Sequence, residues 1–289
     1  MTAEPELADS AVTIVTVGGG PVAADSALLY ADDLAALRGD GVFETLLVRD
    51  GGVCLLEEHL QRLSRSADLM DLPAPDLGEW RDAVDVAVRR WAGTGEGALR
   101  LIYSRGREGG SAPTAYVMLS PLPERIAAAR HEGVSAVTLD RGLSTQALAM
   151  PWLLAGAKTL SYAVNMAALR HAAKQGADDV IFISSDGYVL EGPRSTVVLA
   201  EPGRLVTPPL SHPILRGTTA EALFEVARPA GYTCEYVPLR TADLVAAHDI
   251  WLVSSITLAA RVHTLDGRTL QSRVPEREFA GLVEAAIGR

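Results

Sequence analysis

A short stretch with two prolines, Ser120-Pro121-Leu122-Pro123-Glu124, interrupts the regular patterns of this 289-residue chain. Proline lacks a backbone N–H and breaks helices and most strands. A chain of this length forms one large domain or two of ordinary size. We therefore expect a smaller N-terminal domain over residues 1–121, a linker over 122–132 and a larger C-terminal domain over 133–289.

The N-terminal part mixes strand and helix patterns, which predicts an α+β domain. Asp50-Gly51 lies between two apolar runs, and this pair favours the tight turn of a β-hairpin. Apolar residues recur at helical spacing after residue 57 until Pro73 and Pro75 end the pattern. Strands are expected over 11–17, 41–48, 53–56, 98–104 and 115–119, and helices over 57–69 and 77–91.

The C-terminal part is richer in strands. Gly217-Thr218-Thr219 comes just before an expected helix. A glycine and two threonines at a helix start offer backbone N–H groups and hydroxyls to an anion, which makes this point a candidate phosphate site. Strands are expected over 134–139, 179–184, 188–191, 195–199 and 205–207, and helices over 162–175 and 220–228.

Acidic residues outnumber basic ones in the chain, and the net charge is -10. This charge repels a phosphate backbone and argues against a nucleic acid partner. The polar first ten residues do not resemble a signal peptide, and the apolar runs are too short to span a bilayer. Cys54 and Cys234 lack CxxC spacing, which fits a reducing compartment. HExxH and GxSxG motifs are missing from the sequence. We expect a cytoplasmic protein without a metal site or a membrane span.

Only two of the 26 basic residues are lysines, Lys158 and Lys174. Arginine can replace lysine as a surface charge, but it cannot lose its proton near neutral pH and so cannot form a Schiff base. Lys158 lies among apolar and small residues, a setting that lowers the pKa of an amine. Chance retention beside a turn is the alternative for Lys158. Lys174 is interpreted as a solvated charge at the end of a helix.

Lys158, Glu191 and Thr218-Thr219 match the three needs of a pyridoxal phosphate site. These are a lysine for the aldehyde, an acid that keeps the pyridine nitrogen protonated, and an anion site for the phosphate. Glu191 ends an apolar strand, where burying a carboxylate without a partner is costly. A simple charge at a strand end is the alternative for Glu191.

Several motifs, in their order and spacing, carry a resemblance to a known family. They are Gly39-Asp40-Gly41-Val42-Phe43-Glu44-Thr45, Glu58-His59-Leu60-Gln61-Arg62-Leu63 with Ser66-Ala67, Lys158-Thr159-Leu160-Ser161-Tyr162, Asp186-Gly187-Tyr188-Val189-Leu190-Glu191-Gly192, Leu205-x-Thr207-Pro208 and Ile214-Leu215-Arg216-Gly217-Thr218-Thr219. Over nearly its whole length the chain resembles the fold-type IV pyridoxal phosphate enzymes, or class IV aminotransferases. These comprise branched-chain aminotransferases, D-amino acid aminotransferases and 4-amino-4-deoxychorismate lyases.

The resemblance implies a role for each matching residue. Lys158 would be the Schiff-base lysine and proton shuttle, and Glu191 the partner of the pyridine nitrogen. Arg62, which the residues alone present as a solvated helix charge, would bind the phosphate. Further phosphate ligands would be Thr218, Thr219 and Ser255, although Ser255 could also simply end a strand. Tyr162 would lie near the cofactor, with a helix-face core tyrosine as the alternative.

The resemblance also implies the architecture. It predicts a smaller α+β N-terminal domain and a larger C-terminal domain with a mixed, barrel-like sheet, in a two-domain protein of mixed α/β and α+β class. The cofactor, pyridoxal 5'-phosphate, would lie between the domains, and Lys158 would belong to the larger one. The protein would be a homodimer that acts on a small molecule.

Some positions depart from the family pattern and bear on the substrate. Pro193-Arg194-Ser195-Thr196 follows Glu191 in place of small residues and asparagine, while Arg216 and Ala220 flank the candidate phosphate site. The Asp40–Thr45 start and the Ser254–Ala259 stretch favour aminodeoxychorismate lyase within the family. The alternatives are an aminotransferase acting on D-amino acids or branched-chain L-amino acids, and a non-catalytic protein that binds the cofactor.

Three arginines are candidates for binding a substrate carboxylate, because a guanidinium matches the geometry of a carboxylate. They are Arg100, Arg105 and Arg107, which follow one another around the end of an expected strand. At least one of the three is expected to have a structural role only.

Overall fold

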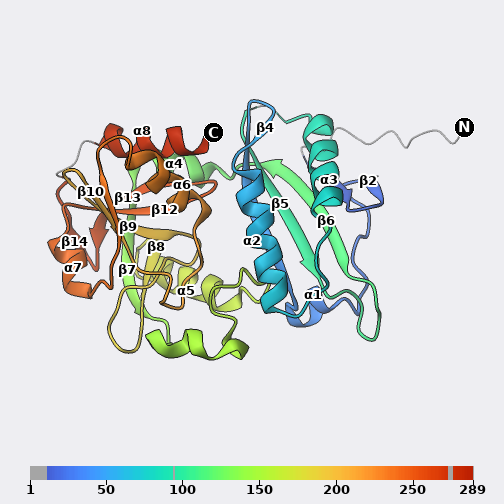
Figure 1. The fold of residues 1–289 in the computed structure, drawn as a ribbon, viewed down its shortest axis with the longest axis horizontal. Coiled ribbons are helices and arrows are strands. Elements are labelled where there is room, and N and C mark those ends of the chain that lie inside the picture. The colour runs from blue at the N-terminus through green and yellow to red at the C-terminus, as the bar shows by residue number, and fades with distance from the viewer. Residues whose placement is uncertain (1–11, 94, 273–275, 289) are drawn as a thin grey trace, which may run out of the picture. The chain divides into compact units, whose positions relative to one another are not determined.

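The computed structural model describes residues 12–93, 95–272 and 276–288 (Figure 1). The chain forms two compact units. The first contains the described residues up to Leu122 together with Ala157–Ser161. The second contains Pro123–Gly156 and the described residues from Tyr162 onward. In the part of the chain that the structure describes, no helix is long and apolar enough to cross a membrane.

The first unit is built on a six-stranded sheet of order β2-β1-β6-β5-β3-β4, in which every neighbouring pair is antiparallel. Its elements are β1 (Thr13–Thr16), β2 (Gly20–Val22), α1 (Leu34–Arg38), β3 (Gly41–Arg49), β4 (Gly52–Val53), α2 (Leu56–Leu69), α3 (Leu77–Arg90), β5 (Gly97–Ser104) and β6 (Thr114–Pro121). The predicted hairpin turn is present, since Asp50 and Gly51 both have positive φ, 51° and 73°. The strand expected over 53–56 is cut short because α2 begins at Leu56.

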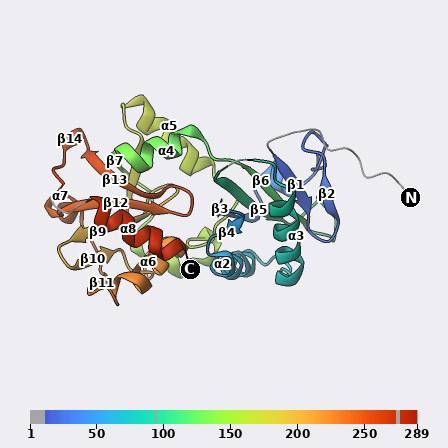
Figure 2. The same ribbon diagram turned by 90° about the horizontal axis from the view of Figure 1, so that it is seen from above.

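Helices α2 and α3 cover one face of this sheet (Figures 1 and 2). Alternate residues of the strands point to that face, as the period of a strand requires. Val42 and Leu46 of β3 thus join Leu60 and Leu63 of α2 in one core. The opposite face carries Phe43 and its alternating neighbours, and this second face becomes important below.

The linker expected over 122–132 is mostly helical, which corrects the prediction from the prolines. Residues Glu124–Glu132 form α4, and the helix belongs to the second unit. Pro123 occupies the N-cap position of α4, where the lack of an N–H costs nothing because the first N–H groups of a helix have no partner within it. Pro121 is the last residue of β6 and Pro123 marks the start of α4, which the buried side chain of Ile126 anchors.

The second unit is built on an eight-stranded mixed sheet of order β11-β10-β9-β12-β13-β7-β8, with β14 paired to β13. The pairs β10 with β11, β13 with β7 and β7 with β8 are parallel. Besides α4, its elements are β7 (Val134–Asp140), the 3-10 helices η1 (Thr145–Ala149) and η2 (Pro151–Leu153), α5 (Ala163–Lys174), β8 (Asp179–Ile183), β9 (Thr196–Glu201), β10 (Arg204–Thr207), α6 (Thr218–Ala227), β11 (Thr233–Tyr236), α7 (Thr241–Ala246), β12 (Asp249–Ser254), β13 (Leu258–Leu265), β14 (Arg268–Thr269) and α8 (Glu276–Ile287).

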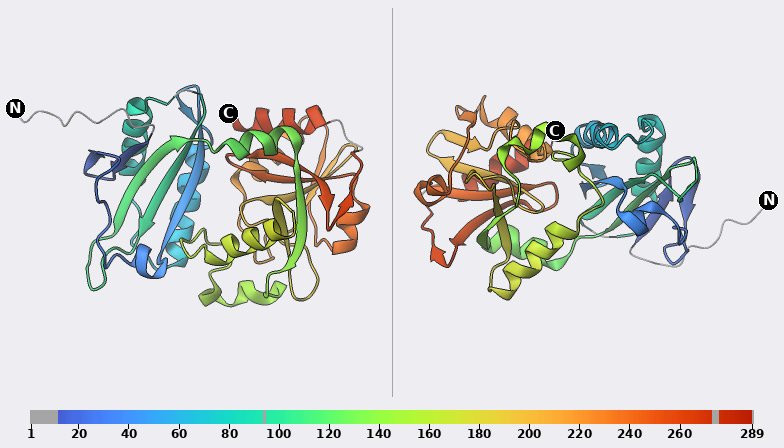
Figure 3. Two further views of the ribbon diagram at one scale, coloured as in Figure 1. Left: turned by 180° about the vertical axis from the view of Figure 1, so that it is seen from behind. Right: turned by 90° about the horizontal axis from the view of Figure 1, so that it is seen from below.

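The mixed sheet curls towards closure, which confirms the expected barrel-like domain (Figure 3). Residues 188–191, expected as a strand, make only short bridges that extend the sheet beyond β8. Leu190 N–H donates to Phe182 O at 2.8 Å, and Val189 N–H donates to Leu239 O at 2.8 Å, just past β11. Helix α8 packs outside the curled sheet, where Phe279 stacks on Trp251 of β12 with ring centroids 4.4 Å apart.

Candidate active site

The short segment Ala157–Ser161 is attached to the edge of β3. Phe43 N–H donates to Lys158 O at 3.0 Å, and Leu160 N–H donates to Gly41 O at 2.7 Å. These ladder-type hydrogen bonds place Lys158 in the first unit, although its position in the chain predicted the C-terminal domain. The pairing with β3, a strand more than 100 positions earlier in the chain, determines which unit contains Lys158. The position of Lys158 in the sequence does not show this pairing.

Two glycines make this attachment possible. A Cβ on Gly41 would lie 2.7 Å from Tyr103 O and 2.8 Å from a methyl group of Leu160. A Cβ on Gly39 would lie 2.8 Å from Ser161 Oγ, and this glycine also has a φ of 66°, which side chains disfavour. The Gly-Asp-Gly motif and the lysine motif are therefore parts of one packed junction within the first unit.

The side chain of Lys158 lies over an aromatic ring. Its Nζ is 4.4 Å from the centroid of the Phe43 ring, within the range of a cation–π interaction. The backbone N–H of Lys158 donates to Ser66 Oγ on α2 at 3.1 Å. Helix α2 thus holds the lysine from one side and β3 holds it from the other.

Arg62, one turn before Ser66 on α2, is buried and paired. Its Nε donates to Glu44 Oε1 at 2.8 Å and its Nη2 donates to Glu44 Oε2 at 2.7 Å. His59 Nδ1 lies 2.7 Å from the same Oε2. All three side chains are buried. The interpretation of Arg62 as a solvated helix charge is therefore wrong.

Electrostatics fixes the charge state of this cluster. Burial alone would raise the pKa of Glu44, but the charge and hydrogen bonds of Arg62, aided by His59, hold that pKa well below its usual range. Burial lowers the pKa of His59 and outweighs the attraction of Glu44. We conclude that Glu44 is ionised and His59 is neutral, so that His59 Nδ1 donates to the carboxylate.

The sequence interpretation assigned no role to Glu44 or His59, yet one signal was available. Glu44 lies between Val42 and Leu46 in a strand of period two, so its side chain points to the same face as theirs. A carboxylate on a core face requires a buried partner. That partner, Arg62, lies on the helix that covers this face.

In the second unit, Glu191 anchors the loop that leads to α6. Its Oε2 accepts a hydrogen bond from Leu215 N–H at 3.0 Å. Tyr162 donates its hydroxyl to Pro193 O, and Asn165 Nδ2 donates to the same carbonyl at 2.7 Å. Burial, with a further contribution from the charge of Glu191, raises the pKa of Tyr162 to about 12. Tyr162 is therefore a neutral hydrogen-bond donor within the electrostatic reach of Glu191.

Helix α6 starts two residues earlier than the sequence pattern indicated, at Thr218. Both Thr218 and Thr219 therefore lie in its first turn, and both are buried. Among the described residues, Thr219 Oγ1 is buried without a hydrogen-bond partner. A buried hydroxyl at a helix N-terminus, where N–H groups point outward, matches the donors that a phosphate needs.

Thr196 brings the start of α6 close to the turn after β12. A Cβ on Gly217 would lie 2.2 Å from Thr196 Oγ1, so the N-cap of α6 passes directly over Thr196. Thr196 in turn pairs with Val253 in the sheet, two residues before Ser255. The second unit thus gathers Glu191, Thr218, Thr219 and Ser255 around the start of β9.

The three candidate carboxylate-binding arginines have different surroundings. Arg105 binds both oxygens of Asp40, at 2.8 and 3.2 Å, and also donates to two backbone carbonyls. Arg107 pairs with Asp32 at 2.8 Å and covers the ring of Tyr30. Arg100 donates to Ser120 Oγ at 3.0 Å, and burial lowers the pKa of Arg100 with no neighbouring acid opposing the effect.

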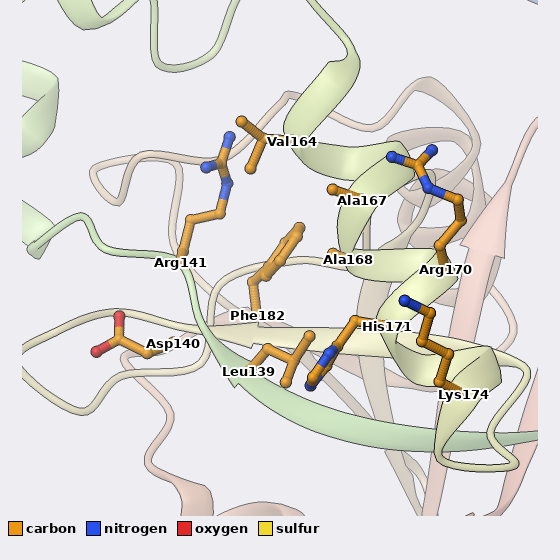
Figure 4. Close-up of a pocket in the computed structure, with 10 residues that line it drawn as sticks. All are labelled: Leu139, Asp140, Arg141, Val164, Ala167, Ala168, Arg170, His171, Lys174 and Phe182. Carbon is orange, nitrogen blue, oxygen red and sulfur yellow. The ribbon is translucent and has the colours of Figure 1, made fainter.

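A pocket of about 490 Å³ lies elsewhere in the second unit, between the end of β7 and α5 (Figure 4). Lys174, at the exposed C-terminal end of α5, lines it together with Arg141 and Arg170. None of the residues predicted to bind the cofactor lines this pocket. The second lysine therefore lies apart from Glu191 and the helix-start hydroxyls.

The first unit thus holds a lysine amine on an aromatic ring and a buried, paired arginine, and the second unit holds an anchored carboxylate and helix-start hydroxyls. These are the kinds of group that a pyridoxal phosphate site needs. The chain matches the sequence profile of the amino-transferase class IV family over residues 41–265, and it belongs to that family.

Similar proteins cover almost the whole chain. A bifunctional aminodeoxychorismate lyase / D-amino acid transaminase from Mycobacterium tuberculosis is 66% identical over 95% of this chain and 98% of that protein. A hypothetical aminotransferase from the same species, solved in a PLP-bound form, has a TM-score of 0.93 at 67% identity over 96% of this chain and 98% of that chain. The fold IV-transaminase CpuTA1 from Curtobacterium pusillum has a TM-score of 0.91 at 41% identity over 97% of this chain and 98% of that chain.

These similarities confirm the predicted family, the two-domain fold-type IV architecture and pyridoxal phosphate as the cofactor. The residues present fit this cofactor, because the buried, unpaired hydroxyl of Thr219 lies at the start of α6, where a phosphate would supply its partner. The protein is an enzyme with a small-molecule substrate.

Proposed function

We propose that this enzyme is an aminodeoxychorismate lyase that converts 4-amino-4-deoxychorismate to 4-aminobenzoate and pyruvate, with transamination of D-amino acids as a second activity. The 66% identity to a protein that carries both names is the observation that supports this proposal. Branched-chain L-amino acids remain the alternative substrates. A non-catalytic protein is disfavoured by the presence of Lys158 in a built environment of Phe43 and Ser66.

We propose the following roles for the residues that would hold the cofactor. Lys158 Nζ would bind it covalently, Glu191 would pair with the pyridine nitrogen, and Arg62 would bind the phosphate. Thr218, Thr219 and Ser255 would provide further phosphate ligands. Tyr162, a neutral donor close to Glu191, would line the cofactor site. Pyridoxal phosphate, when bound, supplies an electron sink for the carbon that carries the substrate amine.

Lys158 and Glu191 would divide the proton chemistry between them. The freed amine of Lys158 would take the proton from the ring carbon that carries the substrate nitrogen. Ionised Glu191 would hold a proton on the pyridine nitrogen. In aminodeoxychorismate the adjacent ring carbon bears an enolpyruvyl ether, so loss of this proton allows the carbon–oxygen bond to break. The ring becomes aromatic, and the released enolpyruvate gains a proton to become pyruvate.

The lyase and transaminase reactions differ in one requirement that can be measured. An amino acid has no leaving group on the adjacent carbon, so its turnover requires a keto acid to restore the cofactor. We expect the purified enzyme to release 4-aminobenzoate from aminodeoxychorismate without added keto acid. We expect D-alanine to be consumed only when a keto acid is present. Rapid keto-acid-dependent turnover of D-alanine or L-leucine, with no 4-aminobenzoate released, would reject the lyase.

We propose Arg100 as the arginine that binds a substrate carboxylate. In the antiparallel pair of β3 and β5, Arg100 lies opposite Thr45 and Ile102 lies opposite Phe43. Phe43 and Thr45 are two residues apart in β3, so their side chains point to the same face of the sheet. Arg100 therefore shares this face with the Phe43 ring that contacts Lys158 Nζ. That face is opposite the one that α2 and α3 cover. Arg105 and Arg107 are already paired with Asp40 and Asp32.

Exchange of Arg100 for glutamine should therefore act on substrate binding. We expect the KM for aminodeoxychorismate to rise by about tenfold or more, the value of one charge-assisted hydrogen bond, with a smaller change in kcat. Steady-state kinetics would measure both. The same exchange at Arg105 or Arg107 tests the alternatives, and a KM increase confined to one of those variants would move the assignment there.

We further propose that the enzyme is a cytoplasmic homodimer that supplies 4-aminobenzoate for folate biosynthesis. The dimer is supported by large apolar side chains exposed on η1, η2 and the residue between them, Leu148, Met150, Trp152 and Leu153. Trp152 is 75% exposed, and exposed clusters of large apolar side chains mark protein interfaces. Sedimentation at twice the mass of the chain would be the signature of the dimer.

A further inference from the structure

Glu44 and His59 are buried, ionisable and absent from the roles proposed above. We propose that they are positioning residues for the cofactor phosphate: Glu44 holds the guanidinium of Arg62 in one orientation, and His59 holds Glu44. This inference rests on the proposed role of Arg62 as a phosphate ligand.

Glu44 and Arg62 form a pair with two hydrogen bonds. Glu44 contacts Nε and Nη2 of Arg62 through its two oxygens, at 2.8 and 2.7 Å. Two parallel hydrogen bonds between planar groups fix the plane of the guanidinium and its rotation. Glu44 thus occupies the edge of the guanidinium formed by Nε and Nη2, so a phosphate bound to Arg62 would meet the guanidinium outside this edge.

The cluster of Glu44, Arg62 and His59 carries no net charge. Ionised Glu44 cancels the charge of Arg62, and neutral His59 adds none. If Arg62 acted only by attraction, a carboxylate within 3 Å would weaken its effect on a phosphate dianion. The value of Glu44 to the site is therefore orientation, because a long and flexible side chain is held ready for its ligand.

His59 restrains the carboxylate of Glu44. Its Nδ1–H donates to Glu44 Oε2 at 2.7 Å, the oxygen that also receives Nη2 of Arg62. This bond adds a second restraint on the carboxylate oxygen that pairs with Arg62 Nη2. Asparagine at position 59 can place an amide N–H close to the position of Nδ1, whereas leucine cannot.

The test compares two cofactors that differ only in the phosphate. Dissociation constants for pyridoxal phosphate and for pyridoxal are measured on the full-length apoprotein and its variants. We expect Glu44→Gln to weaken pyridoxal phosphate binding by about tenfold and to leave pyridoxal binding within about twofold. Arg62→Ala should show the same selectivity, and the double variant should bind pyridoxal phosphate no more weakly than Arg62→Ala alone, because both act through one contact.

Variants at position 59 provide a second test of the proposal, which does not require the Glu44→Gln protein to fold. His59→Asn should bind pyridoxal phosphate nearly as the wild type does, and His59→Leu should lose affinity as Glu44→Gln does. Glu57→Gln is the matched control on the same helix, because it removes only the exposed pair with Arg81. Circular dichroism and thermal melting of each apoprotein report whether the fold is kept.

The outcomes separate the competing explanations. Equal loss of pyridoxal and pyridoxal phosphate binding in Glu44→Gln would make the cluster a structural core pair and overturn the inference. Unchanged or tighter pyridoxal phosphate binding would show that the charge of Glu44 matters more than orientation, and would also overturn it. If Arg62→Ala itself fails to distinguish the two cofactors, the proposed phosphate role of Arg62 is refuted, and the inference falls with it.

Discussion

Exchange of Lys158 for arginine should abolish both proposed reactions while leaving the fold intact. A guanidinium keeps the positive charge over the Phe43 ring, but it can neither condense with the aldehyde of the cofactor nor accept a proton near neutral pH. The loss should reach at least about 10²- to 10⁴-fold, the contribution of a positioned proton-transfer group alone. Single-turnover assays on enzyme reconstituted with pyridoxal phosphate would measure it.

Covalent mapping gives an independent readout for the same residue. The wild-type enzyme should be yellow, and borohydride treatment should fix the cofactor to the peptide that contains Lys158. Lys174→Arg is the matched control, since Lys174 lies on the exposed end of α5 in a different part of the protein, and it should retain both colour and activity. Cofactor recovered on Lys174 would overturn the assignment of Lys158.

Exchange of Glu191 for glutamine should retain the cofactor and lose most of the turnover. The amide oxygen of glutamine can still accept the hydrogen bond from Leu215 N–H, so the loop before α6 should stay in place. The amide cannot keep the pyridine nitrogen protonated, and the electron sink is lost. We expect a decrease in kcat of about 10²- to 10³-fold, the size seen when one preorganised electrostatic contact is removed.

Absorbance and cofactor stoichiometry would show that the Glu191→Gln enzyme is loaded, and melting curves would show that it is folded. Glu235→Gln is a suitable control, because Glu235 forms an ion pair with Arg204 away from Glu191. Near-normal turnover of the Glu191→Gln enzyme would leave Glu191 with a structural role alone, as the anchor of Leu215.

Local patterns predicted most of the elements, and the failures have two causes, long-range pairing and the ambiguity of prolines. The alternation in residues 41–48 and 98–104 gave strands because one face of each is buried under α2 and α3. Residues 188–191 have a strand-like composition, yet they form only bridges to β8 and to the residues after β11. The paired prolines suggested a linker, because a proline that starts a helix and one that ends regular structure look alike in a sequence.

The candidate site could be predicted where composition made a residue stand out. Lys158 was visible because arginine occupies almost every other basic position, and Thr218 and Thr219 because glycine precedes them at a helix start. Without the family resemblance the sequence predicts a solvated charge at Arg62, because the partner Glu44 lies on a strand 18 residues earlier in the chain. A pair between a strand and a helix leaves no periodic signal in either one.

The attachment of Ala157–Ser161 to β3 has a consequence for dividing the protein. A gene cut at the boundary after Leu122 would produce an N-terminal fragment with Arg62, Glu44 and the two glycines of the junction, but without the lysine segment that pairs with β3. The complementary fragment would carry Lys158 on a segment separated from the strand that orders it. Split-protein designs and domain grafts based on this scaffold must therefore keep residues 157–161 together with β3, through a graft of the lysine segment or a circular permutation.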